Sequence, residues 1–266
     1  MEKRKILIID DHDDLATVLE EEFLENGFDV TLSEDRDSAV SMYNKGDFDV
    51  VISDLDGNNL VSKSNDEENS LPCLPDPIPE ARSNIKAFKI CLSNYRANQF
   101  SDEDIELIVK KTLNYKAKFI DRGAAMKDRH EMIDFEVPSL ISLMGDILDY
   151  LMKRVEKLGV IKPEKSNLFV ALDEAFVNAV KHGNKYDKSK MVRISVEISP
   201  KKASFTIEDE GEGFDVKAIP DPTDPENLFK SSGRGVMFIY NIMDKVTYNQ
   251  RGNRLTMVKM NEGDDR

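Results

Sequence analysis

Residues 172–184 read LDEAFVNAVKHGN, and this stretch decides how the second half of the chain is interpreted. Apolar residues recur in it at the spacing of one buried helical stripe: Leu172, Ala175, Phe176, Ala179 and Val180. Two polar residues, Glu174 and Asn178, interrupt the pattern. They are four residues apart, so their side chains share one helical face and can point at a common ligand. We therefore predict a helix from about 163 to 182 that carries a binding site.

Two glycine-rich motifs follow this helix. DEGEGFD at 209–215 comes after a predicted strand, and SGRGVMF at 232–238 comes before a predicted helix. Glycine allows backbone N–H groups to approach a phosphate closely, and a helix N-terminus favours an anion. Each motif alone is equally explained as a turn or linker. The ordered set of E-x-x-x-N, D-x-G-x-G and G-x-G is far more specific, because chance rarely assembles all three motifs in this order.

In these three motifs, residues 134–261 resemble the GHKL-type (histidine-kinase-like) ATPase domain, an α/β sandwich, and specifically that of the bacterial anti-sigma-factor serine/threonine protein kinases. The resemblance implies that Asn178 holds the Mg²⁺ that bridges the ATP phosphates and that Asp209 accepts a hydrogen bond from the adenine amino group. It also implies that Glu174 is the general base that takes a proton from a Ser or Thr hydroxyl. The implied ATP-binding residues are Asn178, Lys181, Asp209, Gly211, Gly213, Gly233, Arg234 and Gly235.

Some positions near these motifs keep two interpretations. Lys181 either reaches a phosphate or only solvates the helix, and His182 stabilises the helix dipole rather than performing chemistry. The segment 216–232 lies between the glycine motifs and contains three prolines, so we expect a mobile lid over the nucleotide. Where the family commonly has Gly-Thr before the last strand, this chain has Gly252-Asn253, which is a departure at one adenine-side contact.

The first half of the chain alternates strand and helix patterns, which predicts a doubly wound parallel sheet. Strands are expected at 5–10, 28–32, 48–53, 87–92 and 119–120, and helices at 15–26, 37–44 and 101–112. A Pro-rich, polar insertion at about 57–84 separates the third and fourth strands. We therefore expect an N-terminal domain at 1–123, a linker at 124–133 and the ATPase domain at 134–261.

Three carboxylates follow strands of this predicted parallel sheet. Asp10 and Asp11 follow the first strand and Asp54 follows the third, so all three should collect at one edge and suit a hard divalent cation. This resembles the response-regulator receiver domain. The resemblance implies that Asp10, Asp11 and Asp54 hold Mg²⁺, that Asp54 is the phospho-acceptor and that Ser93 is the hydroxyl switch. The lysine that the family has after its fifth strand is absent, with Asp121-Arg122 there, so a live receiver and a pseudo-receiver both remain open.

Composition limits the classes of partner. The net charge is -14, and residues 1–133 contribute -12 of it, with 17 Lys+Arg against 29 Asp+Glu. An acidic surface without a dense basic stripe disfavours direct nucleic-acid binding. No apolar run is long enough to cross a membrane and the N-terminus is not a signal peptide, so we expect a cytoplasmic protein. Cys73 and Cys91 lack metal-ligand spacing and are expected to be free thiols.

The sequence thus predicts a two-component-type regulator in which the receiver-like domain controls an ATP- and Mg²⁺-dependent protein serine/threonine kinase. The family resemblance implies a STAS-type anti-anti-sigma protein as substrate and a homodimeric kinase, with a sigma factor and an upstream histidine kinase as further candidate partners. Two alternatives stay open. One is a non-catalytic module that sequesters a sigma factor or partner and binds nucleotide only structurally. The other is a histidine-kinase-like ATPase, although the chain lacks the phospho-acceptor helix pair that precedes such domains.

Overall fold

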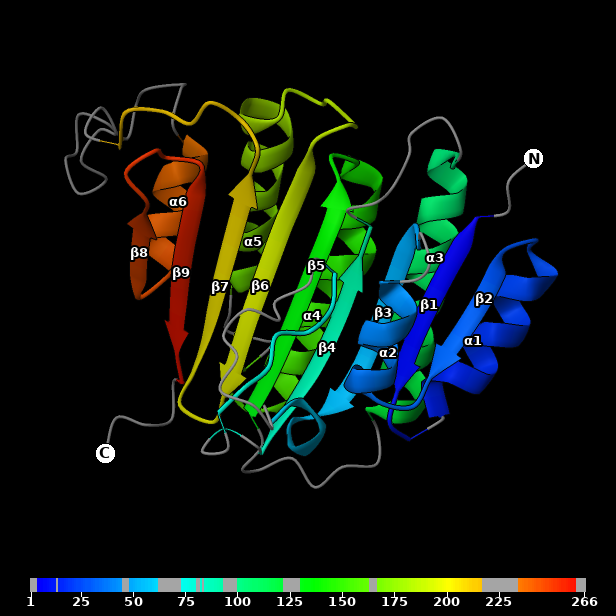
Figure 1. Cartoon of the computed structure of the whole chain (residues 1–266). Coiled ribbons are helices and arrows are strands. Elements are labelled where there is room, and N and C mark those ends of the chain that lie inside the picture. The colour runs from blue at the N-terminus through cyan, green and yellow to red at the C-terminus, as the bar shows by residue number, and fades with distance from the viewer. Residues whose placement is uncertain are drawn as a thin grey trace. The chain divides into compact units, whose positions relative to one another are not determined.

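Figure 1 shows a computed structural model of the chain, which describes residues 4–12, 14–44, 48–61, 73–79, 82, 84–92, 100–121, 130–162, 167–216 and 234–261. The chain divides by its contacts into two compact units, Met1–Pro138 and Ser139–Arg266. Each is described separately. Within the described ranges, none of the helices combines the length and the apolar character needed to span a bilayer.

The N-terminal unit contains a five-stranded sheet in the order β2-β1-β3-β4-β5. Its elements are β1 (Lys5–Asp10), α1 (Asp14–Glu25), β2 (Asp29–Ser33), α2 (Arg36–Tyr43), β3 (Val50–Asp56), a 3-10 turn (Gly57–Leu60), β4 (Ile85–Cys91), α3 (Asp102–Tyr115), a π-helical segment (Lys116–Ile120) and β5 (His130–Pro138). The predicted β-α-β-α-β start is confirmed, because β1 pairs in parallel with both β2 and β3.

Both faces of this sheet are covered, which explains why β1 is apolar along its whole length. Leu7 and Ile9 pack on one face with Ala39 of α2 and with Leu74 from the segment 73–79. Since side chains alternate along a strand, the neighbouring apolar residues of β1 point to the opposite face. The predicted helix at 101–112 is observed as α3, and Ser101 caps its N-terminus, as the Ser101 hydroxyl accepts from the backbone N–H of Asp104 at 3.2 Å.

The sheet is not entirely parallel, and that part of the prediction is wrong. β4 runs antiparallel to β3, with Val51 opposite Cys91 and Asp56 opposite Lys86. A parallel neighbour would need a crossover connection, usually a helix, whereas an antiparallel neighbour does not. The sequence between β3 and β4 is polar and Pro-rich and has no helical pattern. The assignment of Ser93 as a switch assumed a parallel β4; Ser93 itself lies outside the described residues.

The short strand predicted at 119–120 is also wrong. These residues belong to the π-helical segment that continues α3, and the Asp121 N–H bonds the Lys116 carbonyl, five residues back, at 2.9 Å. The fifth strand of the unit is β5, which pairs in parallel with β4. The predicted start of the ATPase domain, residue 134, falls within β5, whereas the observed first unit extends to Pro138 and includes the whole strand.

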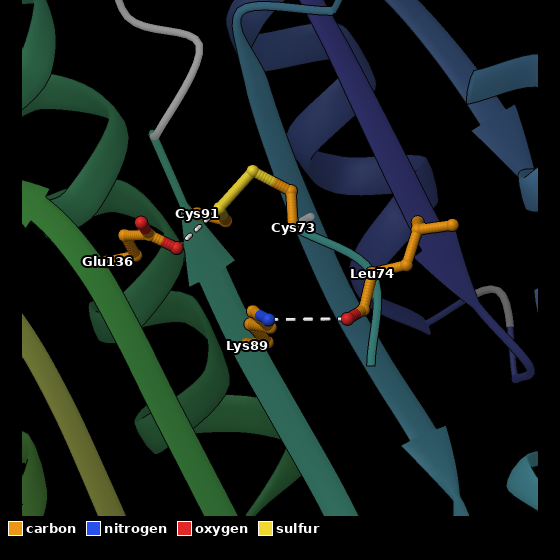
Figure 2. Close-up of a disulfide and its surroundings, with 5 residues drawn as sticks. All are labelled: Cys73, Leu74, Lys89, Cys91 and Glu136. Carbon is orange, nitrogen blue, oxygen red and sulfur yellow. Dashed lines mark hydrogen bonds between the residues drawn. A yellow bond between two sulfur atoms is a disulfide. The ribbon is translucent and has the colours of Figure 1, made fainter. Parts of the chain in front are cut away.

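The two cysteines are joined, so the expectation of free thiols is wrong. Cys73 and Cys91 form a disulfide with a Cα–Cα distance of 5.2 Å (Figure 2). The bond fastens the segment 73–79 to β4, and the Lys89 ammonium donates to the Leu74 carbonyl beside it at 3.2 Å. Both cysteines are buried in the core. Their 18-residue separation gave no sign of this contact because the intervening chain has no regular pattern.

The C-terminal unit contains an antiparallel sheet in the order β6-β7-β9-β8, with helices behind it (Figure 1). Its elements are a 3-10 turn (Ile141–Leu143), α4 (Met144–Lys157), α5 (Leu168–Val177), a π-helical segment (Asn178–Gly183), β6 (Met191–Ser199), β7 (Lys202–Asp209), α6 (Arg234–Ile242), β8 (Lys245–Tyr248) and β9 (Arg254–Met260). β6 and β7 alternate buried and exposed residues, the pattern of strands with one face on a core. The helix predicted at about 163–182 corresponds to α5 and the π-helical segment that follows it.

Candidate functional site

The helix that the sequence analysis began from changes its form at Asn178. α5 buries Leu172, Ala175 and Phe176 as predicted, and the Asn178 N–H still bonds the Glu174 carbonyl, so these two residues are one α-helical turn apart. Beyond Asn178 the helix widens, and the Asn184 N–H bonds the Ala179 carbonyl, five residues back, at 2.8 Å. Such π-helical turns are rare and are frequent at functional sites.

A cavity of about 350 Å³ opens beside this widened turn. Its size is within the range of sites that hold small molecules and cofactors. The lining is mostly apolar with a few polar side chains, and it comes from the α5 turn, the ends of β7 and β8, and the turn before β9: Ala175, Asn178, Ala179, His182, Gly183, Ile207, Asp209, Gly213, Phe214, Val236, Tyr248, Gly252, Asn253 and Leu255. Three predicted residues, Asn178, Asp209 and Gly213, therefore meet at one cavity.

Asp209 ends β7 with its carboxylate packed between two glycines. A Cβ atom on Gly183 or on Gly211 would collide with this carboxylate, so both positions require glycine. The Gly211 N–H donates to Asp209 Oδ1 at 2.8 Å. Burial raises the pKa of Asp209 above its ordinary value, although the bond from Gly211 opposes this shift. The site therefore presents a partly desolvated acceptor that is held in a fixed orientation.

The D-x-G-x-G motif is locked against the turn that precedes β9. Gly213 has a φ of 78°, which favours glycine, and a Cβ there would collide with the Arg251 carbonyl. Arg251 in turn donates from Nη2 to the Gly211 carbonyl at 2.7 Å, and the Phe214 N–H bonds the Arg251 carbonyl at 3.0 Å. The predicted role of these glycines as a structural turn is thus compatible with a role in shaping the cavity.

Aromatic rings form one wall of the cavity. Phe214 and Tyr248 meet edge to face with their ring centroids 5.3 Å apart. Burial raises the pKa of Tyr248 to about 12, so its hydroxyl stays neutral at any physiological pH. A neutral, aromatic wall in the same cavity as the Asp209 carboxylate is suited to a flat ring that carries an amino group.

Asn253, the residue that departs from the family pattern, braces Asp209. Its Nδ2 donates to the Asp209 carbonyl at 2.7 Å, and its Oδ1 accepts from Asn249 Nδ2 at 2.9 Å. Asn249 Oδ1 also accepts from the backbone N–H groups of the turn it closes, including that of Gly252 at 2.8 Å. Asn253 thus lines the cavity while both ends of its amide are bonded to protein.

The sequence analysis missed Asn184, which is fully buried and joins three elements of the site. Its Nδ2 donates to Ser139 Oγ and to the Met191 carbonyl, and its Oδ1 accepts from the Glu210 N–H, each at 2.8 Å. The end of the helix is thereby fastened to the start of β6 and the end of β7. A Gly-Asn pair after a helix looks like an ordinary helix end, so the sequence gave no signal for this role.

The other predicted ATP-site residues either lie near this cavity or fall outside the residues that the structure describes. Glu174 is half-buried and does not line the cavity; its carboxylate lies against Gly235, where a Cβ would collide with it. Lys181 is exposed and is not among the lining residues, whereas His182 is both exposed and lining. Gly233, the side chain of Arg234 and the predicted lid beyond Val216 lie outside the described residues.

A second cluster of predicted residues lies at one edge of the sheet in the N-terminal unit. Asp10 ends β1, and Asp54 lies within β3 rather than after it. Asp10 accepts backbone N–H groups at the start of α1, from Leu15 at 2.7 Å and from Ala16 at 3.0 Å. Burial raises the pKa of Asp10, against these bonds, which lower it. Asp10 therefore caps the N-terminus of α1.

The cluster also contains lysines that the sequence analysis did not assign to it. Lys116 Nζ lies 2.8 Å from Asp54 Oδ2, and Lys86 Nζ lies 3.3 Å from Asp54 Oδ1. Lys116 comes from the π-helical continuation of α3, so a lysine reaches Asp54 although none follows a fifth strand in the family's place. The sequence did not indicate that these lysines contact Asp54, because neither is near Asp54 along the chain and only the fold brings them together.

Comparisons with known proteins bear on the C-terminal half. Residues 137–259 match the family described as "Histidine kinase-like ATPase domain". The chain is also similar to the serine-protein kinase RsbW of Staphylococcus aureus strain JH9, at 28% identity over 142 residues, which cover 50% of this chain and 89% of that protein. The RsbW proteins of strains Newman and JH1 match to the same extent. The C-terminal half therefore carries a GHKL-like ATPase domain that is homologous to a serine-protein kinase.

Proposed function

We propose that the C-terminal unit is an ATP-dependent protein serine/threonine kinase that phosphorylates a STAS-type anti-anti-sigma partner. The observation that carries the proposal is the cavity in which Asn178, Asp209 and Gly213 meet, in a domain homologous to a serine-protein kinase. The STAS partner rests on the resemblance to anti-sigma-factor kinases alone, as do the sigma factor as a second partner and the homodimer.

The residues present fit Mg·ATP. The Asn178 side chain lines the cavity and offers an uncharged oxygen of the kind that Mg²⁺ accepts when phosphates complete its shell. Asp209 offers a fixed acceptor for the adenine amino group, and Phe214 with Tyr248 offers an apolar wall for the ring. Bound Mg²⁺ would neutralise charge that develops on the transferred phosphoryl group. Lys181, Gly233 and Arg234 remain predicted ATP-binding residues.

We assign Glu174 as the general base. It stands one turn before Asn178, half-buried beside Gly235 at the start of α6, so its carboxylate lies next to the cavity but does not fill it. The substrate hydroxyl oxygen would bond to the γ-phosphorus while the bond from that phosphorus to ADP breaks and ADP leaves, and Glu174 would accept the hydroxyl proton. General-base catalysis of this kind contributes about 10²- to 10⁴-fold.

The test is Glu174→Gln, which keeps the shape of the side chain and removes its basicity. We expect phosphate transfer to STAS proteins of the same genome to fall by about 10²- to 10⁴-fold with unchanged ATP affinity. Asp173→Asn is the matched control, because the neighbouring residue of the same helix is also half-buried and points about 100° away. Nearly normal transfer by the Gln variant would refute the assignment.

ATP binding is tested separately, so that failure of the base and failure of the site can be distinguished. Asn178→Ala and Asp209→Ala should each weaken ATP binding strongly in calorimetry, without loss of helix content. Wild-type affinity in both variants would overturn the proposed site. A wild-type protein that binds ATP and a STAS partner but never transfers phosphate would instead be a sequestering module.

The N-terminal unit is proposed as the input domain of this kinase, since its acidic edge resembles a receiver. The full receiver assignment comprises Mg²⁺ at Asp10, Asp11 and Asp54, phosphorylation of Asp54 by an upstream histidine kinase and a switch at Ser93. This assignment stays a prediction. Removal of the N-terminal unit should change kinase output if this unit controls it.

A further inference from the structure

The acidic edge of the N-terminal unit contains its own cations. Lys86 Nζ lies 3.3 Å from Asp54 Oδ1, 3.6 Å from Asp56 Oδ1 and 3.9 Å from Asp11 Oδ1. A Mg²⁺ ion held by these carboxylates would have to approach their oxygens to about 2.0–2.1 Å. The ammonium group of Lys86 is therefore among the same oxygens that a receiver-type ion would use.

The second oxygen of Asp54 is occupied from the other side. Lys116 Nζ lies 2.8 Å from Asp54 Oδ2 and 3.3 Å from Asp121 Oδ1. Lys116 is 2% exposed and Asp54 only 1%, so this ion pair is closed to solvent. Each carboxylate oxygen of Asp54 thus lies within 3.3 Å of an ammonium group, although Oδ1 makes no hydrogen bond among the described residues.

The remaining receiver-type ligand is also committed elsewhere. Asp10 bonds the backbone of His12, Leu15 and Ala16 through its two oxygens. These bonds satisfy N–H groups at the start of α1 that would otherwise be exposed or unpaired. To become a metal ligand, Asp10 would have to give up part of this helix cap.

The reversal of β4 explains how Lys86 reaches the edge. In the antiparallel pairing Lys86, near the start of β4, is opposite Asp56, at the end of β3. In a parallel pairing the start of β4 would lie beside the start of β3, at the other edge of the sheet. A lysine at the start of this strand can neutralise the edge only because the strand is reversed.

A different metal set at the same edge has the same difficulty. Among the described residues, Asp11, His12 and Asp56 have ligand atoms within 4.8 Å of one another. Asp11 Oδ1 is buried and has no hydrogen-bond partner among the described residues; Lys86 Nζ lies 3.9 Å from it and His12 Nε2 lies 3.5 Å from it. The positive charge of Lys86 opposes a metal at this set too.

We propose that Lys86 and Lys116 act as permanent counter-ions of Asp54, so that this edge neither binds Mg²⁺ nor accepts a phosphoryl group. The receiver-like unit is then a pseudo-receiver whose acidic edge is stabilised by lysines in place of a metal. Any control that it exerts on the kinase comes from contacts or ligands other than an aspartyl phosphate.

The first test measures binding of Mn²⁺, which prefers the same oxygen ligands as Mg²⁺, to the nucleotide-free full chain by paramagnetic resonance. We expect no saturable binding at millimolar metal for the wild type and a new Asp54-dependent site in Lys86→Met. Lys89→Met is the matched control, because Lys89 lies on the same strand but donates to the Leu74 carbonyl on the opposite face. It should behave as the wild type does.

Two results would overturn the proposal. One is saturable Mn²⁺ binding by the wild type that Asp54→Asn abolishes; the other is a folded Lys86→Met protein that gains no site. Helix content measured by circular dichroism decides whether the variant is folded, and Lys86→Gln, which retains a polar side chain, replaces it otherwise. The wild-type measurement decides the matter by itself if neither variant folds.

The second test is covalent. The wild type is incubated with acetyl phosphate and Mg²⁺ and its intact mass is measured at once. We expect no added phosphate, and no change in kinase output with beryllofluoride. An adduct that appears in the wild type and disappears in Asp54→Asn would show a live phospho-acceptor and would overturn the proposal.

Discussion

Asp209 has to satisfy two opposing requirements. Its carboxylate is packed beneath Gly183 and Gly211, which desolvates it, and it receives the Gly211 N–H, which orients it. Desolvation favours the neutral acid, whereas a bound adenine amino group would favour the ionised form. The affinity of the proposed site for ATP is therefore coupled to the protonation of one residue.

This coupling predicts a pH dependence. The pKa of Asp209 is raised, so a part of the free protein is protonated at a pH where an ordinary aspartate is not. Because ATP binds the ionised form better, lowering the pH through this raised pKa should reduce affinity by up to about tenfold per pH unit. Calorimetry from neutral to acidic pH measures it. His182→Gln is the control for the imidazole that also lines the cavity, and a slope that persists in Asp209→Asn would contradict the assignment.

The ion pairs of Asp54 predict that this single residue contributes to the stability of the protein. Asp54→Asn leaves the buried ammonium of Lys116 without its closest carboxylate, which should lower the free energy of unfolding by about 3–5 kcal/mol. Urea unfolding followed by circular dichroism measures this loss, since the chain has no tryptophan. Asp37→Asn, at an exposed position in the first turn of α2, is the comparison and should cost far less. If Asp54→Asn is as stable as the wild type, the two lysines do not need the Asp54 carboxylate as a counter-ion.

Residues were predictable where chemistry and order along the chain were enough. Asn178 follows from the E-x-x-x-N motif and Asp209 and Gly213 from the D-x-G-x-G motif, and the structure brings the three to one cavity. Asn184 and Lys116 were not predictable, because their roles depend on π-helical turns and on which elements lie opposite them. A lysine far from Asp54 in sequence carries no mark of being its partner.

At the scale of elements, periodicity identified the helices and strands but not their directions or exact helical form. The strand pattern of β4 was correct and its orientation was wrong, since alternation is the same in parallel and antiparallel strands. The residues at 119–120 have a pattern too short to separate a strand from the end of a helix. The disulfide was invisible for a similar reason, because contact between distant residues depends on the fold.

The Cys73–Cys91 disulfide predicts a measurable contribution from the segment 73–79. Closing a loop of this length should stabilise the N-terminal unit by about 3 kcal/mol, because it limits the unfolded chain. Cys73→Ala with Cys91→Ala should lose about this amount in urea unfolding, and so should the wild type in reductant. If the cysteines are free thiols instead, they will titrate with a thiol reagent after unfolding without reductant, and reductant will have no effect.

The whole molecule has two hydrophobic cores with different stabilising groups. The disulfide and the buried ion pairs belong to the unit Met1–Pro138, whereas the candidate nucleotide cavity belongs to Ser139–Arg266. A ligand stabilises the structure that binds it by mass action. A ligand or reductant that acts on one unit should therefore shift the unfolding transition of that unit and leave the transition of the other unit unchanged.

Calorimetric heating of the full chain tests this division. We expect Mg·ATP at about 100 times its Kd to raise the temperature of one unfolding transition, which corresponds to about 2.7 kcal/mol of stabilisation. Reductant should lower the temperature of the other transition. Asp209→Ala should remove the effect of ATP and leave the effect of reductant. A single transition that responds to both agents alike would show that the two cores unfold as one.

The π-helical turn at Asn178–Gly183 limits how this gene can vary. A widened turn contains one residue more than the α-helical turn it replaces, so loss of a single codon there would restore a regular helix. Every later side chain of the turn would then rotate by about 100°, which would carry His182 and Gly183 away from Asp209. A substitution in this turn changes one side chain, whereas a one-codon deletion moves all the later side chains and removes the cavity. Selection on this stretch therefore acts on the number of its residues as well as on their identities.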